Sequence, residues 1–397
     1  MRKYLLGLAV LLMGTAVMTS CSDDNDTPGG GTYQEVYSTG AYIVNAGSMG
    51  YNIESSLTAI DYKTGVATQN VFKTANNRSL GNTANDGVVY GDKMYIAVDQ
   101  SNTIEVVDKK TKQSIKQIKT TELMGDAEGV EPRHIIADGG YVYFTTYGGY
   151  VAQVDTVNFA LKQKYQVGNF PEGLVVNGST LYVANSNYGQ GGGNLSAINL
   201  STGAVETKNI EGINNPTNLY VADNQLFAID NQYYDANWAT YGENALKSVD
   251  FAKGTSTKIV EGNYAAFATI PAGYFTGSTT KTRTNVIPAE LVFYVINAPF
   301  GGEVSYKVVE LSNGEYHIAD FTPSEKVYSP CGIAVDPITR YLFILSYNPG
   351  EGGYADYGGN GYVMMYDFKG NKLAKFDTGV GSCAIFFDSA SRTVYRE

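Results

Sequence analysis

The stretch PEGLVVNGSTLYVANSNYGQGGGNLSAINLSTG, residues 171–203, contains the pattern that decides the fold. It holds three short apolar runs, PEGLVVN (171–177), LYVANS (181–186) and LSAINLST (195–202), separated by turns rich in Gly, Asn and Ser. Short runs rich in β-branched and aromatic residues, bounded by turn residues, are typical of β-strands. The stretch therefore predicts consecutive strands joined by tight turns.

Each of the last two runs occurs seven times along the chain, counting the copy quoted above. LYVANS has its counterparts in YIVNAG (42–47), MYIAVD (94–99), VYFTTY (142–147), LFAIDN (226–231), VFYVIN (292–297) and LFILSY (342–347). LSAINLST has its counterparts in LTAIDYKT (57–64), IEVVDKKT (104–111), VAQVDTVN (151–158), LKSVDFAK (246–253), YKVVELSN (306–313) and VMMYDFKG (363–370). An acidic or amide side chain recurs before each turn, where it can accept turn amides, so we assign a structural role to Asp61, Asp108, Asp155, Asn199, Asp250, Glu310 and Asp367.

PEGLVVN also recurs, before most of the repeats, as PRHIIAD (132–138), PTNLYVA (216–222) and PCGIAVD (330–336). Four-stranded sheets repeated radially form a β-propeller, and this third run predicts the innermost strand. The first repeat has no such strand at the N-terminus, and SCAIFFD (382–388) supplies one. The sequence predicts an all-β, seven-bladed β-propeller whose C-terminal strand pairs into the blade that holds residues 42–47, which removes the last open edge.

The N-terminus predicts export. Arg2 and Lys3 precede an apolar run (4–17) that ends at Ser20-Cys21, the layout of a signal peptide. We expect a lipoprotein signal over 1–20, a lipidated Cys21 within a flexible acidic and Gly-rich tether over 21–38, and the propeller over 39–397. VMTSC resembles a loose lipobox, and SDDND (22–26) resembles the acidic tag that sends some Gram-negative lipoproteins outside the outer membrane. The alternatives are cleavage without a lipid and a solvated linker on a periplasmic lipoprotein.

Composition excludes one class of partner. The formal net charge is −11, and cleavage of Arg2 and Lys3 makes it more negative. An acidic surface repels phosphate backbones, so nucleic acid is excluded as a partner. The 45 glycines and 32 tyrosines fit an exported β-rich protein with many tight turns.

The loops after the second strand of each blade should share one face of the propeller, and nearly all of them contain aromatic residues or are long. The chain's one Trp lies in the longest, DNQYYDANWATYGEN (230–244). Rings offer contact area at low entropy cost, so this face is our candidate binding face. The alternative is that the rings only pack the loops. The candidate ligand contacts are Tyr147, Tyr188, Tyr233, Tyr234, Trp238, Tyr241, Tyr347 and Tyr357, with Arg133 at the channel mouth.

Alignment of the inner strands gives one channel-mouth residue per blade: Asp86, Arg133, Glu172, Thr217, Ala265, Cys331 and Cys383. This mixed ring is a poor metal site, and the loop 350–361 lacks the Asp spacing of a calcium loop. His317 lies on an outer strand, and His134 has no adjacent nucleophile, so we expect no enzyme, metal or cofactor. A lyase or hydrolase would have to use Asp86, Arg133, His134 and Glu172.

The two remaining cysteines stand at equivalent positions of adjacent inner strands. Cys331 and Cys383 each precede an Asp by five residues, and exported proteins keep disulfides. The alternatives left open are a disulfide that fastens the closing strand and two small buried residues that happen to align.

Several segments, PEGLVVNGSTLYVAN, PCGIAVDPITRYLFIL, YIVNAGSMG and GDKMYIAVDQSNTIEVVD, resemble the YncE-like propellers of bacterial surface lipoproteins, over the whole chain from about Gly40. Together with the acidic tag, the chain is similar to the BtuG-type cobalamin-binding proteins. This resemblance implies an outer-membrane lipoprotein that captures cobalamin and passes it to a TonB-dependent transporter. A glycan- or protein-binding surface propeller is the alternative, because aromatic loops cannot separate a corrin from a sugar.

Overall fold

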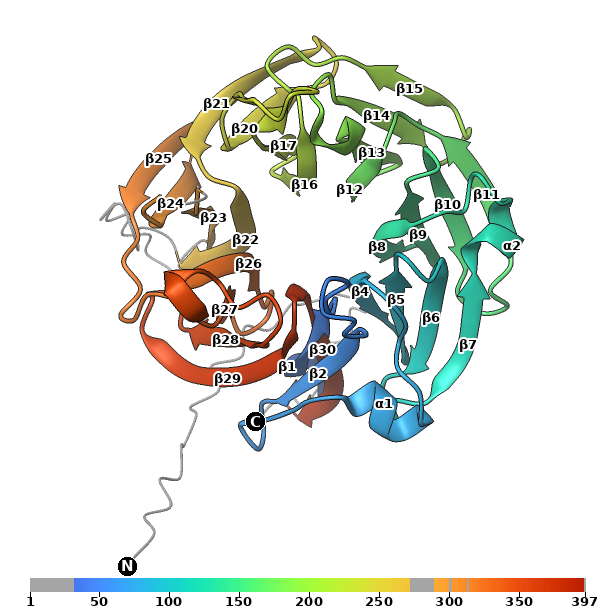
Figure 1. The fold of residues 1–397 in the computed structure, drawn as a ribbon, viewed down its shortest axis with the longest axis vertical. Helices are drawn as coiled ribbons and strands as arrows, with labels where there is room; N and C mark the ends of the chain where they lie inside the picture. Colours follow the sequence, from blue (N-terminus) through green and yellow to red (C-terminus); the bar gives the residue numbers. More distant parts are fainter. Residues whose placement is uncertain (1–31, 272–288, 300–301, 313, 396–397) are drawn as a thin grey trace, which may run out of the picture.

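The computed structural model describes residues 32–271, 289–299, 302–312 and 314–395. Within them the strands form seven four-stranded antiparallel sheets arranged radially around one axis (Figure 1). This nearly all-β architecture is that of a β-propeller. The expected signal peptide and Cys21 lie outside the described residues. No helix in the described part of the chain is long and apolar enough to cross a membrane.

We number the sheets in chain order. Sheet 1 contains β1 (Thr32–Asn45), β2 (Ser56–Asp61), β3 (Val66–Thr68) and β30 (Ser382–Tyr395). Sheet 2 contains β4 (Ala84–Tyr90), β5 (Lys93–Val98), β6 (Thr103–Asp108) and β7 (Ser114–Lys119). Sheet 3 contains β8 (Pro132–Asp138), β9 (Tyr141–Thr146), β10 (Tyr150–Asp155) and β11 (Leu161–Gln166). Sheet 4 contains β12 (Pro171–Asn177), β13 (Thr180–Asn185), β14 (Asn194–Asn199) and β15 (Val205–Lys208).

Sheet 5 contains β16 (Pro216–Ala222), β17 (Gln225–Asp230), β20 (Ala245–Asp250) and β21 (Thr255–Glu261). Sheet 6 contains β22 (Tyr264–Pro271), β23 (Ala289–Asn297), β24 (Ser305–Ser312) and β25 (Glu315–Asp320). Sheet 7 contains β26 (Ser329–Val335), β27 (Leu342–Tyr347), β28 (Asn360–Tyr366) and β29 (Lys372–Val380). The short elements are α1 (Val71–Asn76), α2 (Thr120–Met124), the 3-10 turns η1 (Asn187–Gly189) and η2 (Glu351–Gly353), and the hairpin of β18 (Tyr233–Tyr234) and β19 (Thr240–Tyr241).

The core lies between the sheets. Successive side chains of a strand point to opposite faces, so β5 sends Met94 and Ile96 toward sheet 1 and Tyr95 and Ala97 toward sheet 3. The described residues form seven such apolar clusters, one for each pair of neighbouring sheets. One of them joins Ile43 of sheet 1 to sheet 7, so the first and last sheets also pack against each other.

The C-terminal strand β30 pairs with β1, and the register places Tyr42 opposite Phe386. The pairing extends further than the sequence indicated, since Thr32 lies opposite Tyr395. Residues 32–38, which we assigned to the tether, are thus part of strand β1. Residues 32–38, which precede Gly40, pair only with β30, and the two strands form a two-stranded ribbon there.

Most of the repeated acidic and amide residues have the structural role that the sequence predicts. The side chain of Asp108 accepts the backbone N–H of Thr111 at 2.7 Å, and Asn199 accepts that of Thr202 at 3.0 Å. Glu310 differs, because it lies buried inside β24, before the turn.

Candidate functional site

The loops that follow the second strands gather on one face. Pro132, Pro171 and Pro216, which begin their inner strands, lie opposite the last residues of the second strands. The connections between sheets therefore reach the same face as these loops. We call this face the loop face; its described loops are 46–55, 99–102, 147–149, 186–193, 231–244, 298–299, 302–304 and 348–359.

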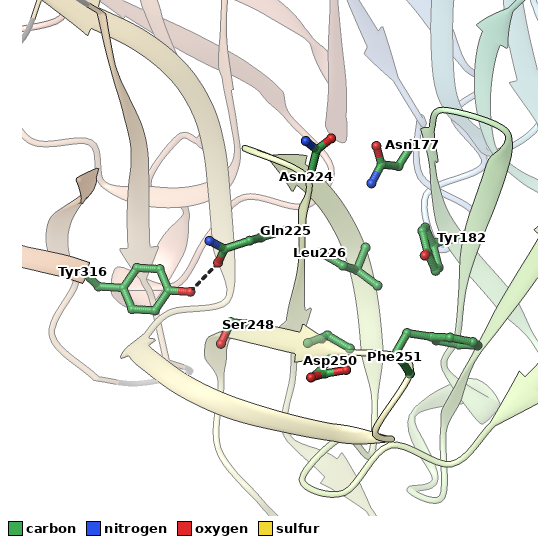
Figure 2. A pocket seen from close by; sticks show the side chains of 11 residues that line it. Asn177, Tyr182, Asn224, Gln225, Leu226, Ser248, Asp250, Phe251 and Tyr316 are labelled. Atoms are coloured by element: carbon green, nitrogen blue, oxygen red, sulfur yellow. Dashed lines mark hydrogen bonds between the residues drawn. The ribbon is translucent and has the colours of Figure 1, made fainter. Parts of the chain in front are cut away.

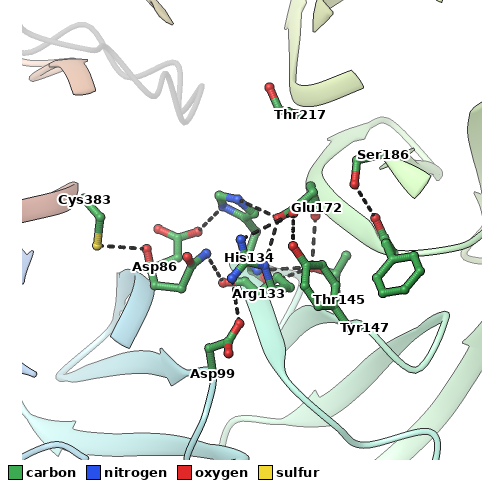
Figure 3. A network of polar contacts seen from close by, with 12 residues as sticks. Asp86, Asp99, Arg133, His134, Thr145, Tyr147, Glu172, Ser186, Thr217 and Cys383 are labelled. Atoms are coloured by element: carbon green, nitrogen blue, oxygen red, sulfur yellow. Dashed lines mark hydrogen bonds and ion pairs between the residues drawn. The ribbon is translucent and has the colours of Figure 1, made fainter. Parts of the chain in front are cut away.

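At the channel mouth on this face, Arg133 is held by two carboxylates (Figure 3). Its guanidinium donates to Asp99 Oδ2 at 2.6 Å, to Glu172 Oε2 at 3.0 Å and to Glu172 Oε1 at 3.3 Å. The Tyr147 ring covers one side of the guanidinium, with Arg133 Cζ 4.5 Å from its centroid, and the Tyr147 hydroxyl donates to Glu172. Although burial opposes its charge, Glu172, Tyr147 and Asp99 raise the pKa of Arg133 above its usual value.

His134 lies between two carboxylates of neighbouring sheets. Its Nδ1 is 3.1 Å from Asp86 Oδ2 and its Nε2 is 3.6 Å from Glu172 Oε2. Burial disfavours the charged ring, but the hydrogen bond and charge of Asp86, with Glu172, raise the pKa of His134 above its usual value. The two carboxylates therefore shift the titration of this imidazole to a higher pH than that of a free histidine.

The structure thus brings together the four residues that an enzyme at this mouth would have to use: Asp86, Arg133, His134 and Glu172. Their polar atoms are already bonded to one another. Asp86 Oδ2 also accepts the backbone N–H of Ile135 at 3.1 Å, and Asp86 Oδ1 that of Gly87 at 2.8 Å. The arrangement is a mutually satisfied network rather than a nucleophile poised beside a base.

Beside this network, three aromatic rings pack edge to face. Tyr147 lies 5.1 Å from Phe170 and 5.8 Å from Tyr188, between ring centroids. Tyr188 is 60% exposed and its backbone is left-handed, with a φ of 56°. A bulky residue in this region is uncommon, and such strain collects at ligand sites. The Ser186 side chain, which accepts the Tyr188 N–H at 3.2 Å, holds the turn in place.

Phe170 also has a positive φ, but its explanation is different. Thr83 and Glu131, which likewise precede an inner strand, have the same left-handed backbone. The carbonyl of each of the three accepts an N–H from the residue after the neighbouring second strand. This conformation is part of the repeat, whereas that of Tyr188 is particular to its loop.

The loop that contains Trp238 forms the small hairpin of β18 and β19. Tyr233 and Tyr241 stack at 5.7 Å, and Tyr234 contacts Trp238 at 6.2 Å. Trp238 is 81% exposed and has a φ of 64°, and Asp235 braces the turn by accepting the N–H of Ala239. Tyr234, Trp238 and Tyr241 are therefore exposed in this loop, whereas Tyr233 is half-buried.

On sheets 6, 7 and 1 the equivalent inner-strand positions hold Ala265, Cys331 and Cys383 instead of charged residues. Tyr347 and Tyr357 meet at 4.9 Å. Burial raises the pKa of Tyr264 to about 12, with Cys331 and Tyr357 adding to the effect. Burial, together with Asp86, raises the pKa of Cys383 to about 12, and burial also raises that of Cys331, so both thiols stay protonated.

Cys331 and Cys383 are free thiols in the structure, where the sequence left a disulfide open. The reason is that each sulfur is directed to a different backbone carbonyl. Cys331 Sγ donates to Ser382 O at 3.3 Å, while Cys383 Sγ donates across to Ala84 O of sheet 2 at 3.3 Å. The thiols thus tie β30 to both neighbouring inner strands without a covalent bond.

Sequence reasoning missed several residues of this face. Asp99 and Phe170 border the network, and Tyr264 joins the mouth on sheet 6. Tyr51 is exposed and lies against Gly358, where an added Cβ would be 3.1 Å from its ring. Their position in the repeat was the available signal. Asp99 directly follows a second strand, β5, and Phe170 directly precedes an inner strand, β12.

A hollow with a volume of about 400 Å³ lies elsewhere, at the turns of sheets 4 and 5 (Figure 2). Asn177, Asn224 and Asp250 belong to hairpin turns at the end of the sheets away from the loop face. It is an open groove between exposed turns, and Tyr316 closes one side by donating to Gln225. Its position separates it from the aromatic loops.

Among the described residues, no three His, Cys, Asp or Glu side chains are grouped so that they could hold a metal ion.

A family model described as a domain of unknown function, DUF5074, matches residues 39–381. The chain belongs to the DUF5074 family. No curated protein sequence matches it.

Three solved structures illustrate what the DUF5074 chain is similar to. A functionally unknown protein from Desulfotomaculum acetoxidans DSM 771 has a TM-score of 0.56 at 10% identity, covering 88% of this chain and 99% of that one. Kuenenia stuttgartiensis hydrazine synthase has a TM-score of 0.53 at 14% identity, and the match covers 78% of this chain and 95% of that one. A putative 6-phosphogluconolactonase from Bacteroides uniformis ATCC 8492 has a TM-score of 0.52 at 12% identity, and the match covers 88% of this chain and 99% of that one. At these identities the likeness shows the propeller-like fold alone.

Proposed function

We propose that this protein is a lipid-anchored, closed seven-bladed propeller, of the YncE-like and BtuG-type kind, at the outer membrane and facing the exterior. It captures a small solute, cobalamin foremost, on the loop face and passes it to a TonB-dependent outer-membrane transporter. The protein binds the solute without chemical change, because the polar atoms at the mouth are bonded to one another.

The observation that carries this proposal is the cluster of the Tyr147, Phe170 and Tyr188 rings at the channel mouth. Tyr188 is exposed yet fixed by Ser186, so it offers a rigid surface at low entropy cost. Further rings at Trp238 and Tyr357 widen the face to the dimensions of a large solute. A corrin is broad and fringed with amides, and it suits a surface of tyrosines and hydrogen-bonding groups.

The single Trp provides a direct test of the proposal. Cobalamin added to the full chain in detergent should quench the fluorescence of Trp238, because this residue is the only Trp and lies on the loop face. Calorimetry should show that Trp238→Ala weakens binding by about 2 kcal/mol, the loss expected of a central aromatic contact.

Val157→Ala is the matched control, since Val157 is 83% exposed on the turn after β10, away from the loop face. Unchanged cobalamin affinity in Trp238→Ala would remove this loop from the site. Absence of any cobalamin binding to the wild type would overturn the cobalamin proposal.

A second candidate, a glycan- or protein-binding surface propeller, rests on the exposure of Trp238, which is 81%. A glycan that binds the wild type and is lost in Trp238→Ala, with no cobalamin binding, would support it.

The anchor has a separate test. Labelled palmitate should enter the wild-type chain and not the variant Cys21→Ser, and a protease added to intact cells should cleave the wild-type protein. Labelling that persists without Cys21 would contradict the assigned lipidation site.

A further inference from the structure

Sheet 2 carries a run of lysines in a chain that is acidic as a whole. Residues 109–119, KKTKQSIKQIK, contain five lysines and no Asp or Glu, whereas the full chain has 39 acidic residues against 28 Lys and Arg. The run forms the turn between β6 and β7 and all of β7. The helix α1 packs against this turn, because the Asn76 side chain donates to Lys112 O at 2.8 Å and accepts the N–H of Ser114 at 2.8 Å. Lys73, three residues before Asn76 in α1, extends the run.

Three of these amines are exposed and have no charged partner. Lys73, Lys110 and Lys116 lie on the surface, and none of them forms an ion pair with any residue that the structure describes. The carboxylate that precedes the run, Asp108, is used by the turn itself, since it accepts the backbone N–H groups of Lys110 and Thr111 at 3.0 and 2.7 Å. The three amines are therefore available to an anionic partner outside the molecule.

The turn of this run lies at the end of the propeller that the expected anchor would hold. Strand β1 ends directly before the loop 46–55 of the loop face, so Thr32 stands at the opposite end. Strand β6 also begins at the loop face, and the turn that follows it reaches the same end as Thr32. There Lys109 Nζ donates to Asp388 Oδ1 at 2.7 Å and to Ser389 O at 3.0 Å, where the ribbon of β1 and β30 begins. Sheets 1 and 2 are neighbours around the ring (Figure 1).

A lipid on Cys21 would keep this end of the propeller near the membrane. Ten residues separate Cys21 from Thr32, which limits their separation to about 40 Å. A tether of this length holds the surface of the protein at a high effective concentration over the bilayer, so that even a weak attraction decides the orientation. The formal net charge of −11 opposes the approach of the remaining surface to anionic lipid.

We infer that Lys73, Lys110 and Lys116 form a docking surface, the lysine surface, for the anionic headgroups of the membrane that holds the anchor. The lysine surface lies on the phosphate groups, and the loop face, at the other end of the strands, is turned away from the bilayer. The inference rests on the proposed function, because the lipid on Cys21 provides the tether. It adds an orientation in which the aromatic loops stay open to a solute.

The reactivity of the amines tests the lysine surface in the lipidated full chain. The chain is bound to vesicles of phosphatidylcholine, with or without phosphatidylglycerol, and treated with a neutral acetylating reagent. Acetylation of Lys110 and Lys116, read by mass spectrometry, should be at least about fivefold slower on the anionic vesicles, the ratio that the attraction of one lysine, about 1 kcal/mol, produces. Concentrated salt should remove the difference. Lys258 is the internal control, because its amine pairs with Glu243 of the loop face.

Two charge-matched variants locate the effect. Lys110→Gln/Lys116→Gln should restore the acetylation of Lys73 on anionic vesicles. Lys253→Gln/Lys258→Gln removes the same charge from sheet 5, across the ring, and should leave Lys73 protected (Figure 1). Equal acetylation of Lys110 and Lys116 on the two kinds of vesicle, or an equal slowing of Lys258, overturns the inference.

These outcomes are distinct from those of the proposed function. A lipidated chain that binds cobalamin but shows no protection of Lys110 and Lys116 keeps the proposed function and removes the lysine surface. Protection in a chain that does not bind cobalamin keeps the lysine surface and removes cobalamin.

Discussion

The two halves of the channel mouth use equivalent backbone positions for opposite purposes. On sheets 2 to 4 the positions are Asp86, Arg133 and Glu172, which form a charged network. On sheets 7 and 1 they are Cys331 and Cys383, which stay neutral and donate to carbonyls. The repeat thus fixes where a side chain stands, and it leaves the chemistry of that side chain free to differ from sheet to sheet.

The stability of the charged half should depend most on Glu172, so Glu172→Ala is the substitution with the largest expected effect. It removes two of the contacts of the buried Arg133 guanidinium and one of His134. Removal of one partner of a buried pair costs about 3–5 kcal/mol, and we expect a loss of this order in the free energy of unfolding, measured in urea.

The control is Asp92→Ala. The Asp92 carboxylate is 78% exposed beside Lys93, so its removal should lower the free energy of unfolding by less than about 1 kcal/mol. Cys331→Ala tests the neutral half and should cost about 1 kcal/mol. Equal losses in Glu172→Ala and Cys331→Ala would show that the two halves do not differ energetically.

Solute binding compares the halves directly through Tyr188 and Tyr357, which stand on opposite parts of the mouth. Each is more than half exposed, at 60% and 52%. A solute that spans the mouth should lose about 2 kcal/mol of affinity with either Tyr188→Ala or Tyr357→Ala, measured by calorimetry. If one substitution has no effect, the solute occupies only the other half.

Stability should depend on pH through the charged half. Asp86 and Glu172 raise the pKa of His134 against the opposing effects of burial and Arg133. The unfolded pKa is near 6.5, so the stabilisation is fully present below it and is lost as the pH rises through the higher folded value.

The midpoint of thermal unfolding should therefore fall as the pH rises above about 6.5. His134→Gln should flatten this dependence, and His317→Gln should retain it. A wild-type midpoint that rises over this interval would contradict the assigned protonation.

The smallest effect concerns thiol reactivity in the neutral half. Burial raises the pKa values of Cys331 and Cys383, and only the thiolate reacts, so labelling by a disulfide reagent should be slow in the folded chain. The unfolded, non-reduced chain should yield two thiols when Cys21 carries lipid. A count of zero would restore the disulfide that the structure lacks.

The strands were predictable because their signals are local. LYVANS and LSAINLST carry their own turn residues, and the register places Leu181 opposite Ile198 and Asn185 opposite Asn194. Alignment of the inner strands also brought Arg133 and Glu172 to one mouth, since equivalent positions of adjacent sheets lie side by side.

Contacts made by loop residues were not predictable in the same way. Phe170 contacts Tyr188 from a left-handed backbone position, which no pattern in the neighbouring sequence specifies. The contact of Arg133 with Asp99 was not predictable from the sequence around Arg133, because Asp99 lies in the loop after β5 of the neighbouring sheet. The early start of β1 at Thr32 depended on a partner at the far end of the chain.

The ribbon of residues 32–39 and 388–395 has a mechanical consequence for a chain that is held from its N-terminal side. Because the strands are antiparallel, Thr32 and Tyr395 stand together at the outer end. Tension applied ahead of Thr32 opens the ribbon one residue pair at a time, like a zip, instead of shearing all its hydrogen bonds at once. The ribbon must therefore open, with loss of the contacts of Glu35 with Arg392 and of Gln34 with Thr393, before the force acts on Gly40 and on the pairing of β1 with β2.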